Sequence, residues 1–206
     1  MAQMILDHLV VGATTLAAAQ DHVERSLGLA MQAGGQHAVF QTHNALIGLE
    51  DGLYLEAIAP DPSRPPPERP RWYDLDRYSG PARLSNWAAA VADMDAALPM
   101  MPDGVGSPVQ VRRGDLQWRM AVSAMGTTPY DNLWPALIEW PDGMHPAPRL
   151  APSGLRLRRL TLSHPQADRL AETLAAQMQD DRIRVEVGEI GLEAAFDGPR
   201  GACSLT

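Results

Sequence analysis

One pattern of apolar runs occurs twice along the chain and limits the folds that it can adopt. A strand-like run at residues 5–11 is followed by a helical repeat and by three more strand-like runs, the last at 53–59. A second set begins at 84–91 and ends at 134–140. One helix among several strands in each set predicts an α+β fold. The similar ends of the two sets, YLEAI and ALIEW, indicate an internal duplication.

The helices have recognisable limits. Thr14 or Thr15 can cap a helix in which apolar residues recur at helical spacing from 16 to 27, and Gly28 can end it. In the second set, Asp93 introduces a short helical stretch before Pro99. Gly34-Gly35 is expected to form a turn between strands at 29–32 and 35–41.

The repeats divide the chain into parts of one composite domain, expected over residues 1–206. Unit one covers 4–60 and unit two covers 83–143. Residues 60–82 form a proline-rich connector, because six prolines between 60 and 70 remove too many backbone donors for a central strand or helix. Residues 154–206 begin the pattern a third time and are predicted to form a partial unit.

Two ionisable residues interrupt otherwise apolar strands. His8 lies within LDHLVV and Glu56 lies within YLEAIA. Alternation places Leu6, His8 and Val10 on one face of the first strand, and Glu56 on one face of the later strand. If both faces line one cavity, an imidazole and a carboxylate converge there. His8 and Glu56 could also simply hydrogen-bond each other.

The order of elements and several motifs resemble the vicinal oxygen chelate superfamily, which includes glyoxalase I, extradiol dioxygenases and bleomycin-resistance proteins. LDHLVVGATTLAAA, AGGQHAVFQTHNALIGL, YLEAIA, LQWRMA and LWPALIEW look like the glyoxalase-like domain proteins of that superfamily. The resemblance implies paired βαβββ units that form a concave mixed sheet, or cup, with the third partial unit at the C-terminus.

The resemblance also implies a metal site, because in that superfamily the ligands come from the first and last strands of each unit. His8, Glu56 and Glu139 match three of the four ligand positions of the superfamily, while the fourth ligand position falls on Asn86 or Trp87. These residues would suit a divalent ion such as Mn, Fe, Ni or Zn and a substrate with two neighbouring oxygens. Glu56 or Glu139 would then be the catalytic proton carrier of a lyase, isomerase or dioxygenase-like enzyme.

Four residues are candidates for binding the small-molecule ligand: His37, Trp118, Arg119 and Trp134. Trp134 and Trp140 are expected to share a strand face and to form an aromatic wall with Trp118. Arg119 could hold a carboxylate by two parallel hydrogen bonds.

Other readings of the same residues stay open. The missing fourth ligand favours a metal-free protein of the bleomycin-resistance type that sequesters an amphipathic ligand. Glu139 could equally be a strand-end carboxylate that faces water. A third alternative is a degenerate scaffold whose remaining role is self-association.

Charge and composition exclude several classes of protein. A formal net charge of -8 at pH 7 argues against a nucleic-acid partner. No apolar run approaches a membrane span, and the N-terminus carries no secretion signal, so a cytoplasmic protein without membrane association is expected. The lone Cys203 agrees with a reducing compartment. The proteins that this chain resembles often complete or protect their sheets by pairing, and its composition is acidic and edge-rich, so we expect a homodimer.

Overall fold

The computed structural model describes residues 4–206, so residues 1–3 of the expected domain lie outside the described part. Its elements are listed here in chain order: β1 Ile5–Gly12, α1 Leu16–Leu27, β2 Gln32–His37, β3 Thr42–Gly48, η1 Glu50–Gly52, β4 Tyr54–Pro60, η2 Trp72–Asp74, β5 Arg83–Ala90, α2 Met94–Ala97, η3 Leu98–Met100, β6 Ser107–Arg113, β7 Leu116–Val122, β8 Ala136–Glu139, η4 Ala147–Arg149, β9 Arg156–Ser163, α3 Ala167–Ala175, β10 Ile183–Glu186, β11 Gly191–Gly198 and β12 Gly201–Leu205. The η elements are single 3-10 turns.

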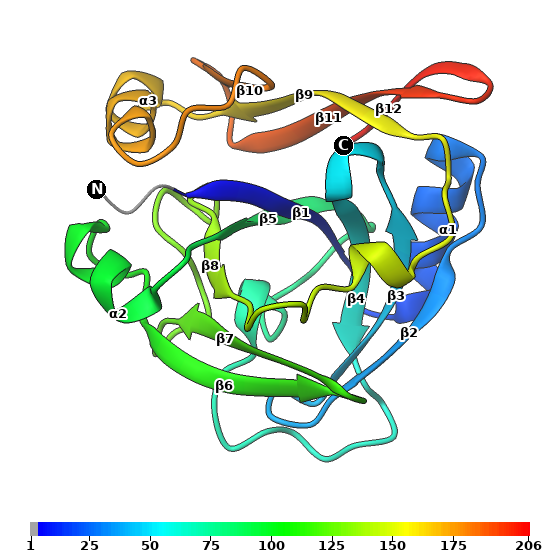
Figure 1. Cartoon of the computed structure of the whole chain (residues 1–206), viewed down its shortest axis with the longest axis horizontal. Helices are drawn as coiled ribbons and strands as arrows, with labels where there is room; N and C mark the ends of the chain where they lie inside the picture. Colours follow the sequence, from blue (N-terminus) through cyan, green and yellow to red (C-terminus); the bar gives the residue numbers. More distant parts are fainter. Residues whose placement is uncertain (1–3) are drawn as a thin grey trace.

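Eight strands form one curled sheet in the order β2-β3-β4-β1-β5-β8-β7-β6 (Figure 1). In the first half β1 pairs in parallel with β4, and in the second half β5 pairs in parallel with β8. The halves join through the antiparallel pair of β1 and β5. The predicted pair of βαβββ units and their concave sheet are therefore confirmed.

Helix α1 begins and ends at the expected residues. The Thr15 side chain accepts a hydrogen bond from the backbone N–H of Ala18, and Gly28 ends the helix with a φ of 69°. The expected turn at Gly34-Gly35 is wrong, because β2 runs through both glycines with a register shift. The Gly35 backbone N–H donates to the Asn44 side chain at 2.8 Å, which keeps this part of β2 attached to β3.

The two faces of the main sheet belong to different apolar clusters. On the convex face, Leu9, Val11 and Trp87 pack with helix α1 and with the C-terminal strands. On the concave face, Val10, Ile58 and residues of β6–β8 pack with aromatic residues of the connector. We call the concave side the cup.

The third unit forms its own sheet in the order β10-β9-β11-β12 and covers the convex face of the main sheet (Figure 1). Its first strand, β9, pairs in parallel with β10 and antiparallel with β11. In the other two units the first strand instead pairs in parallel with the last. The third unit therefore contributes to the outer core and leaves the cup to the first two units. No helix in residues 4–206 is long and apolar enough to cross a membrane.

Candidate functional site

The cup has an apolar and aromatic lining into which a few ionisable side chains project. Its buried apolar members are Val10, Phe40, Ile58, Trp72, Tyr73, Leu75, Ala88, Val111, Leu116, Trp118, Met120, Val122, Ala136 and Ile138. Asp7, His8, His37 and Glu56 are each no more than 5% exposed. Because buried ionisable groups are costly without partners, their contacts define the site.

Asp7 and His8 are sequence neighbours that meet because β1 has a bulge. The register of β1 against β5 shifts between Leu6 and His8. Asp7 Oδ1 lies 2.6 Å from His8 Nδ1, while Asp7 Oδ2 accepts from Trp140 Nε1 at 3.0 Å and lies 3.2 Å from His145 Nε2. The expectation that Leu6 shares the face of His8 is wrong: the bulge changes the alternation, and Leu6 packs in the convex cluster.

The Asp7 carboxylate fixes the hydrogen-bonding role of His8. Burial raises the pKa of Asp7, but hydrogen bonds from His145 and His8 and their charges outweigh burial and hold this pKa well below its ordinary value. An ionised carboxylate only accepts hydrogen bonds, so His8 Nδ1 carries the hydrogen that faces Asp7. In neutral His8, the lone pair of Nε2 then faces the cup.

His8 Nε2 has two polar neighbours. The Tyr73 hydroxyl lies 3.3 Å away and Glu56 Oε2 lies 3.6 Å away. Burial, and then the charges of Glu56 and Asp7, raise the pKa of Tyr73 well above its ordinary value, so its hydroxyl stays protonated and donates to His8. The His8 ring stacks on Tyr54 with 4.4 Å between ring centroids. These contacts fix the position of the imidazole.

Glu56 is held by a polar branch from the neighbouring strands. The Asn44 side-chain amide donates to Glu56 Oε1, and the backbone N–H of Gly35 fixes the orientation of that amide. A Cβ at Gly34 would lie only 2.0 Å from Asn44 Oδ1, so the close approach requires glycine there. Glu56 therefore keeps one oxygen bound and presents Oε2 toward His8.

His37 lies inside the cup, as the sequence led us to expect. Its Nδ1 is 3.0 Å from Thr42 Oγ1 and its Nε2 is 3.4 Å from Asn44 Nδ2. Burial, followed by the charge of Arg113, lowers the pKa of His37 well below its ordinary value. His37 is therefore neutral at neutral pH and extends the polar branch that holds Glu56.

The connector closes the cup with aromatic side chains from its single turn η2. Trp72 stacks on Phe40 with centroids 4.2 Å apart and meets His37 edge-on at 5.0 Å. Tyr73 covers His8 through the contact described above. The open volume left beside His8 and Glu56 is about 10 Å³, which is close to the minimum for one water molecule.

The predicted residues Glu139 and Arg119 lie outside this group. Arg119 Nη1 pairs with Glu139 Oε2 at 3.0 Å, and Arg119 Nη2 pairs with Asp95 at 2.7 Å. Glu139 follows Ile138, which lies in the cup, so alternation turns Glu139 to the opposite face of β8. Glu139 is thus a partner of Arg119 and does not join His8 and Glu56.

Register shows which residues of unit two correspond to the polar residues of unit one. His8 pairs with Tyr54 across β1 and β4, and Ala88 pairs with Ala136 across β5 and β8. His8 therefore corresponds to Ala88, and Tyr54 corresponds to Ala136. Glu56 lies two residues after Tyr54, so its counterpart in unit two is Ile138, two residues after Ala136. Unit two therefore presents apolar side chains where unit one presents an imidazole and a carboxylate.

The tryptophans only partly form the expected wall. Trp118 lies in the cup, and its ring centroid is 5.1 Å from that of Trp140. Trp134 packs in the convex cluster, and its predicted place on the same face as Trp140 is wrong. Strand β8 begins only at Ala136, so Trp134 belongs to the preceding turn and strand alternation does not apply to it.

The donor set does not fit a resident divalent metal. Metal sites usually use three or more protein ligands. Here His8 and Glu56 face each other, but the corresponding positions of unit two, Ala88 and Ile138, have no donor atom. The neighbouring Tyr73 hydroxyl keeps its proton. Within residues 4–206, no group of three or more His, Cys, Asp or Glu side chains is arranged to hold a metal ion.

Sequence reasoning missed several residues of the site. Asp7 was assigned no role, although a carboxylate inside LDHLVV is as unusual as the histidine beside it. Trp72 and Tyr73 form an aromatic pair in the connector, which is a detectable signal for a segment that returns to the core. His145 lies 138 residues from Asp7 in the chain, and no local pattern indicates their contact.

Within this cup, Asp7 orients His8, and His8 Nε2 and Glu56 Oε2 face the same small space. The two acceptor atoms, 3.6 Å apart, are close enough to exchange protons with neighbouring atoms of one molecule placed beside them. The aromatic walls exclude water, which strengthens the electrostatic interactions of both groups. The geometry is suited to acid–base chemistry on a small molecule.

Comparisons with known proteins give the same fold. The profile of the glyoxalase-like domain family matches residues 6–178. No curated protein matches the chain in sequence.

Solved structures similar to this chain include a hypothetical protein from Staphylococcus aureus. The two are 13% identical with a TM-score of 0.63, over 91% of this chain and 87% of that one. Methylmalonyl-CoA epimerase from Mycobacterium tuberculosis is 20% identical over 66% of this chain and 87% of that one, with a TM-score of 0.44. A mutant 4-hydroxymandelate synthase from Streptomyces coelicolor is 13% identical over 99% of this chain and 62% of that one, with a TM-score of 0.46.

Proposed function

Since the chain belongs to the glyoxalase-like domain family, and so to the vicinal oxygen chelate superfamily, we propose that it is an enzyme of the isomerase or lyase type. It moves a proton on a small oxygenated molecule whose reactive end reaches His8 and Glu56 in the cup. The observation that carries this proposal is the line from Asp7 through His8 to Glu56, with distances of 2.6 Å and 3.6 Å. A protein that only binds a ligand does not need a buried carboxylate to orient a histidine toward a second carboxylate.

In the proposed reaction, His8 Nε2 takes a proton from a carbon next to a carbonyl group, and the electron pair of the broken C–H bond moves onto the carbonyl oxygen as an enolate. The enolate is then protonated again at carbon, and Glu56 is placed to exchange a proton on the same molecule. Asp7 stabilises the imidazolium that forms, because its carboxylate stays ionised beside Nδ1. Asn44 holds Glu56 in place through Oε1. His37 and Asn44 are positioning residues, while Trp118 supplies part of the apolar wall.

The test is hydrogen–deuterium exchange, which needs no knowledge of the net reaction. Small 2-keto and 2-hydroxy acids are incubated with the protein in D₂O, and loss of the carbon-bound proton signal is followed by NMR. We expect exchange with wild type, and a loss of about 10²–10⁴-fold in His8→Gln and Glu56→Gln. Exchange that is unchanged in both variants would refute the assignment of His8 and Glu56.

The metal-free binding protein is the second candidate, and the apolar wall formed by Trp118 and Trp140 favours it. Such a protein binds its ligand without turning it over. It would show saturable quenching of tryptophan fluorescence by an amphipathic compound, with no deuterium exchange in that compound. His8→Gln would then alter affinity alone.

Metal dependence, which the family resemblance implied, is tested by calorimetric titration of Mn, Ni and Zn at about pH 7.5, where histidine is neutral. From the donor set we expect wild type to bind none of them more tightly than Glu56→Gln does. Glu139→Gln is the matched control, because Glu139 faces away from His8. If wild type bound one of these ions more tightly than Glu56→Gln does, the result would support a metal site at His8 and Glu56.

We also propose that the chain forms a homodimer, because β2 and β6, which lie close to each other at the two ends of the curled sheet, have no further hydrogen-bonded strand within residues 4–206. Light scattering at micromolar concentration measures this directly. A monomer mass would remove the proposal and leave the proposed chemistry unaffected.

A further inference from the structure

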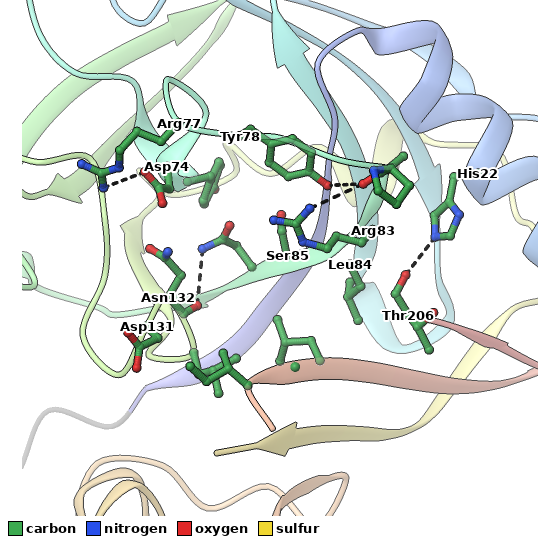
Figure 2. Close-up of a pocket in the computed structure, with 18 residues that line it drawn as sticks. His22, Asp74, Arg77, Tyr78, Arg83, Leu84, Ser85, Asp131, Asn132 and Thr206 are labelled. Atoms are coloured by element: carbon green, nitrogen blue, oxygen red, sulfur yellow. Dashed lines mark hydrogen bonds and ion pairs between the residues drawn. The ribbon is translucent and has the colours of Figure 1, made fainter. Parts of the chain in front are cut away.

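A second, larger cavity lies beside the cup (Figure 2). Its volume is about 620 Å³, within the usual range for small-molecule sites. The connector, the first residues of β5, the loop before β8 and the third unit all line it. Asp131 and Asn132 lie at one end, and His22 with Thr206 lies at the other. We call this cavity the side pocket.

Tyr73 is the wall between the side pocket and the cup, because its side chain lines both spaces. Tyr73 and Asp74 both have a φ of 57°, a left-handed conformation that is unfavourable for residues other than glycine. Such strain persists only where the surroundings impose it and is frequent in segments that move during function. Displacement of the Tyr73 ring would join the side pocket to the space beside His8.

The side pocket combines an apolar floor with hydrogen-bonding groups. Leu84, Leu133 and Leu192 supply the apolar part. The Ser85 hydroxyl is buried and has no hydrogen-bond partner among residues 4–206. Asn86 donates to the carbonyl of Asn132 over a long 3.4 Å. Asn86 could therefore exchange this long contact for a hydrogen bond to a bound molecule, whereas the buried Ser85 hydroxyl would first have to turn toward the pocket.

The side pocket is lined by charges of both signs, Asp74 and Asp131 together with Arg77 and Arg83, and Asp131 is paired with His164 at 3.1 Å. Arg77 is paired with Asp74 at 2.7 Å. Arg83 stacks over Tyr78 at 4.2 Å and donates to the carbonyls of Ser79 and Pro81. Arg83 forms no ion pair with a carboxylate in the part of the chain that the structure describes. It is the group in the side pocket best placed to bind an anion.

We propose that the side pocket binds a small carboxylate with an apolar body, with the carboxylate at Arg83 and the body on Leu133 and Leu192. Tyr73 is the gate through which its reactive end reaches His8 and Glu56. The gating part rests on the proposed function, while binding in the side pocket does not. The cup alone leaves too little space for any substrate, and the side pocket supplies that space.

The binding test uses hexanoate, with hexan-1-ol as an uncharged probe of equal length, on the full chain by calorimetry. We expect hexanoate to bind wild type, and Arg83→Gln to weaken it about tenfold while leaving hexan-1-ol unchanged. Arg112→Gln is the matched control, since Arg112 is exposed on β6 and does not line the pocket. No hexanoate binding, or equal loss in both variants, overturns the proposal.

The gate test compares Tyr73→Ala, which removes the ring, with Tyr73→Phe, which keeps it. Hexanoate should shift the NMR signals of the His8 ring in Tyr73→Ala and leave them unchanged in Tyr73→Phe; no shift in Tyr73→Ala refutes the gate. If Tyr73→Ala does not fold, nuclear Overhauser contacts between hexanoate and the Leu133 and Leu192 methyls in wild type test the pocket itself, and their absence refutes it. Missing deuterium exchange with intact hexanoate binding would refute only the proposed function.

Discussion

The two halves of the main sheet share a topology and differ in what they present to the cup. Unit one places His8, Asn44 and Glu56 there. At the corresponding registers, unit two places Ala88, Trp118 and Ile138. At these three registers a polar group in unit one is replaced by an apolar side chain in unit two, whereas His37 corresponds to Arg113, a charged residue that also lines the cup. The His8 and Glu56 pair therefore has no counterpart in unit two.

This difference shows that duplicated folds need not duplicate their chemistry. In the sequence Glu139 resembles Glu56, because each is a glutamate in the last strand of its unit. In the structure Glu139 lies one residue after Ile138, which occupies the position that faces the cup. A one-residue offset on a strand reverses the face of the sheet. The carboxylate then forms an outer ion pair with Arg119, whose geometry is unrelated to the site.

The largest expected loss of stability follows from removing the buried charge of Asp7 in unit one. Asp7→Asn should lower the free energy of unfolding by about 3–5 kcal/mol, because it removes the charged partner of His8 and His145 in a buried site. Urea unfolding at neutral pH, followed by circular dichroism, measures the change. A loss below about 1 kcal/mol would mean that Asp7 is dispensable and would break the contrast between the halves.

The stability difference between wild type and Asp7→Asn should depend on pH. The folded-state pKa of Asp7 lies below its ordinary value of 3.8, so the stability that Asp7 contributes is present above that value and declines as pH falls through and below it. The difference between wild type and Asp7→Asn should therefore be constant near neutral pH and shrink below about pH 4. A difference that grows with acid would contradict this sign.

Glu56→Gln should have the next largest effect, a loss of about 1–3 kcal/mol, because the amide keeps the shape but only part of the hydrogen bonding to Asn44. The matched change in unit two is Ile138→Gln. It should cost at least as much, since it buries an amide where Trp118 replaces Asn44. If Ile138→Gln is neutral in urea unfolding, the second wall is not the apolar surface described here.

A smaller loss is expected for Tyr73→Phe, about 0.5–1.5 kcal/mol, because one buried hydrogen bond to His8 is removed. Tyr78→Phe is the control, since the Tyr78 hydroxyl binds the Pro81 carbonyl at an exposed site. Thermal and urea unfolding of both variants give the comparison. Equal losses would show that the contact between Tyr73 and His8 adds nothing specific to the cup.

The smallest effect is expected for Glu139→Gln, about 0–1 kcal/mol, because its ion pair with Arg119 is partly exposed to solvent. Raising the salt concentration should reduce even this difference. A loss as large as that of Glu56→Gln would mean that the two carboxylates are equivalent after all.

Periodicity and turn residues predicted much of the architecture. Helix α1, the strands of both units and the connector follow from patterns that span a few neighbouring residues. The pairing of His8 with Glu56 was also accessible, because each is an ionisable exception in an apolar strand. The prediction for Trp134 failed because strand boundaries are set by pairing with neighbours, and β8 pairs only from Ala136 onward.

The sequence by itself determined the order of elements in two βαβββ units and the presence of one imidazole and one carboxylate in apolar strands, because alternation and capping are local properties of the chain. Only the tertiary structure decided that Asp7 turns toward His8, that Glu139 turns away from the cup and that Tyr73 closes it. Each of these depends on a bulge, a register or a returning loop. Such features are fixed by contacts between residues far apart in the chain, which no local pattern encodes.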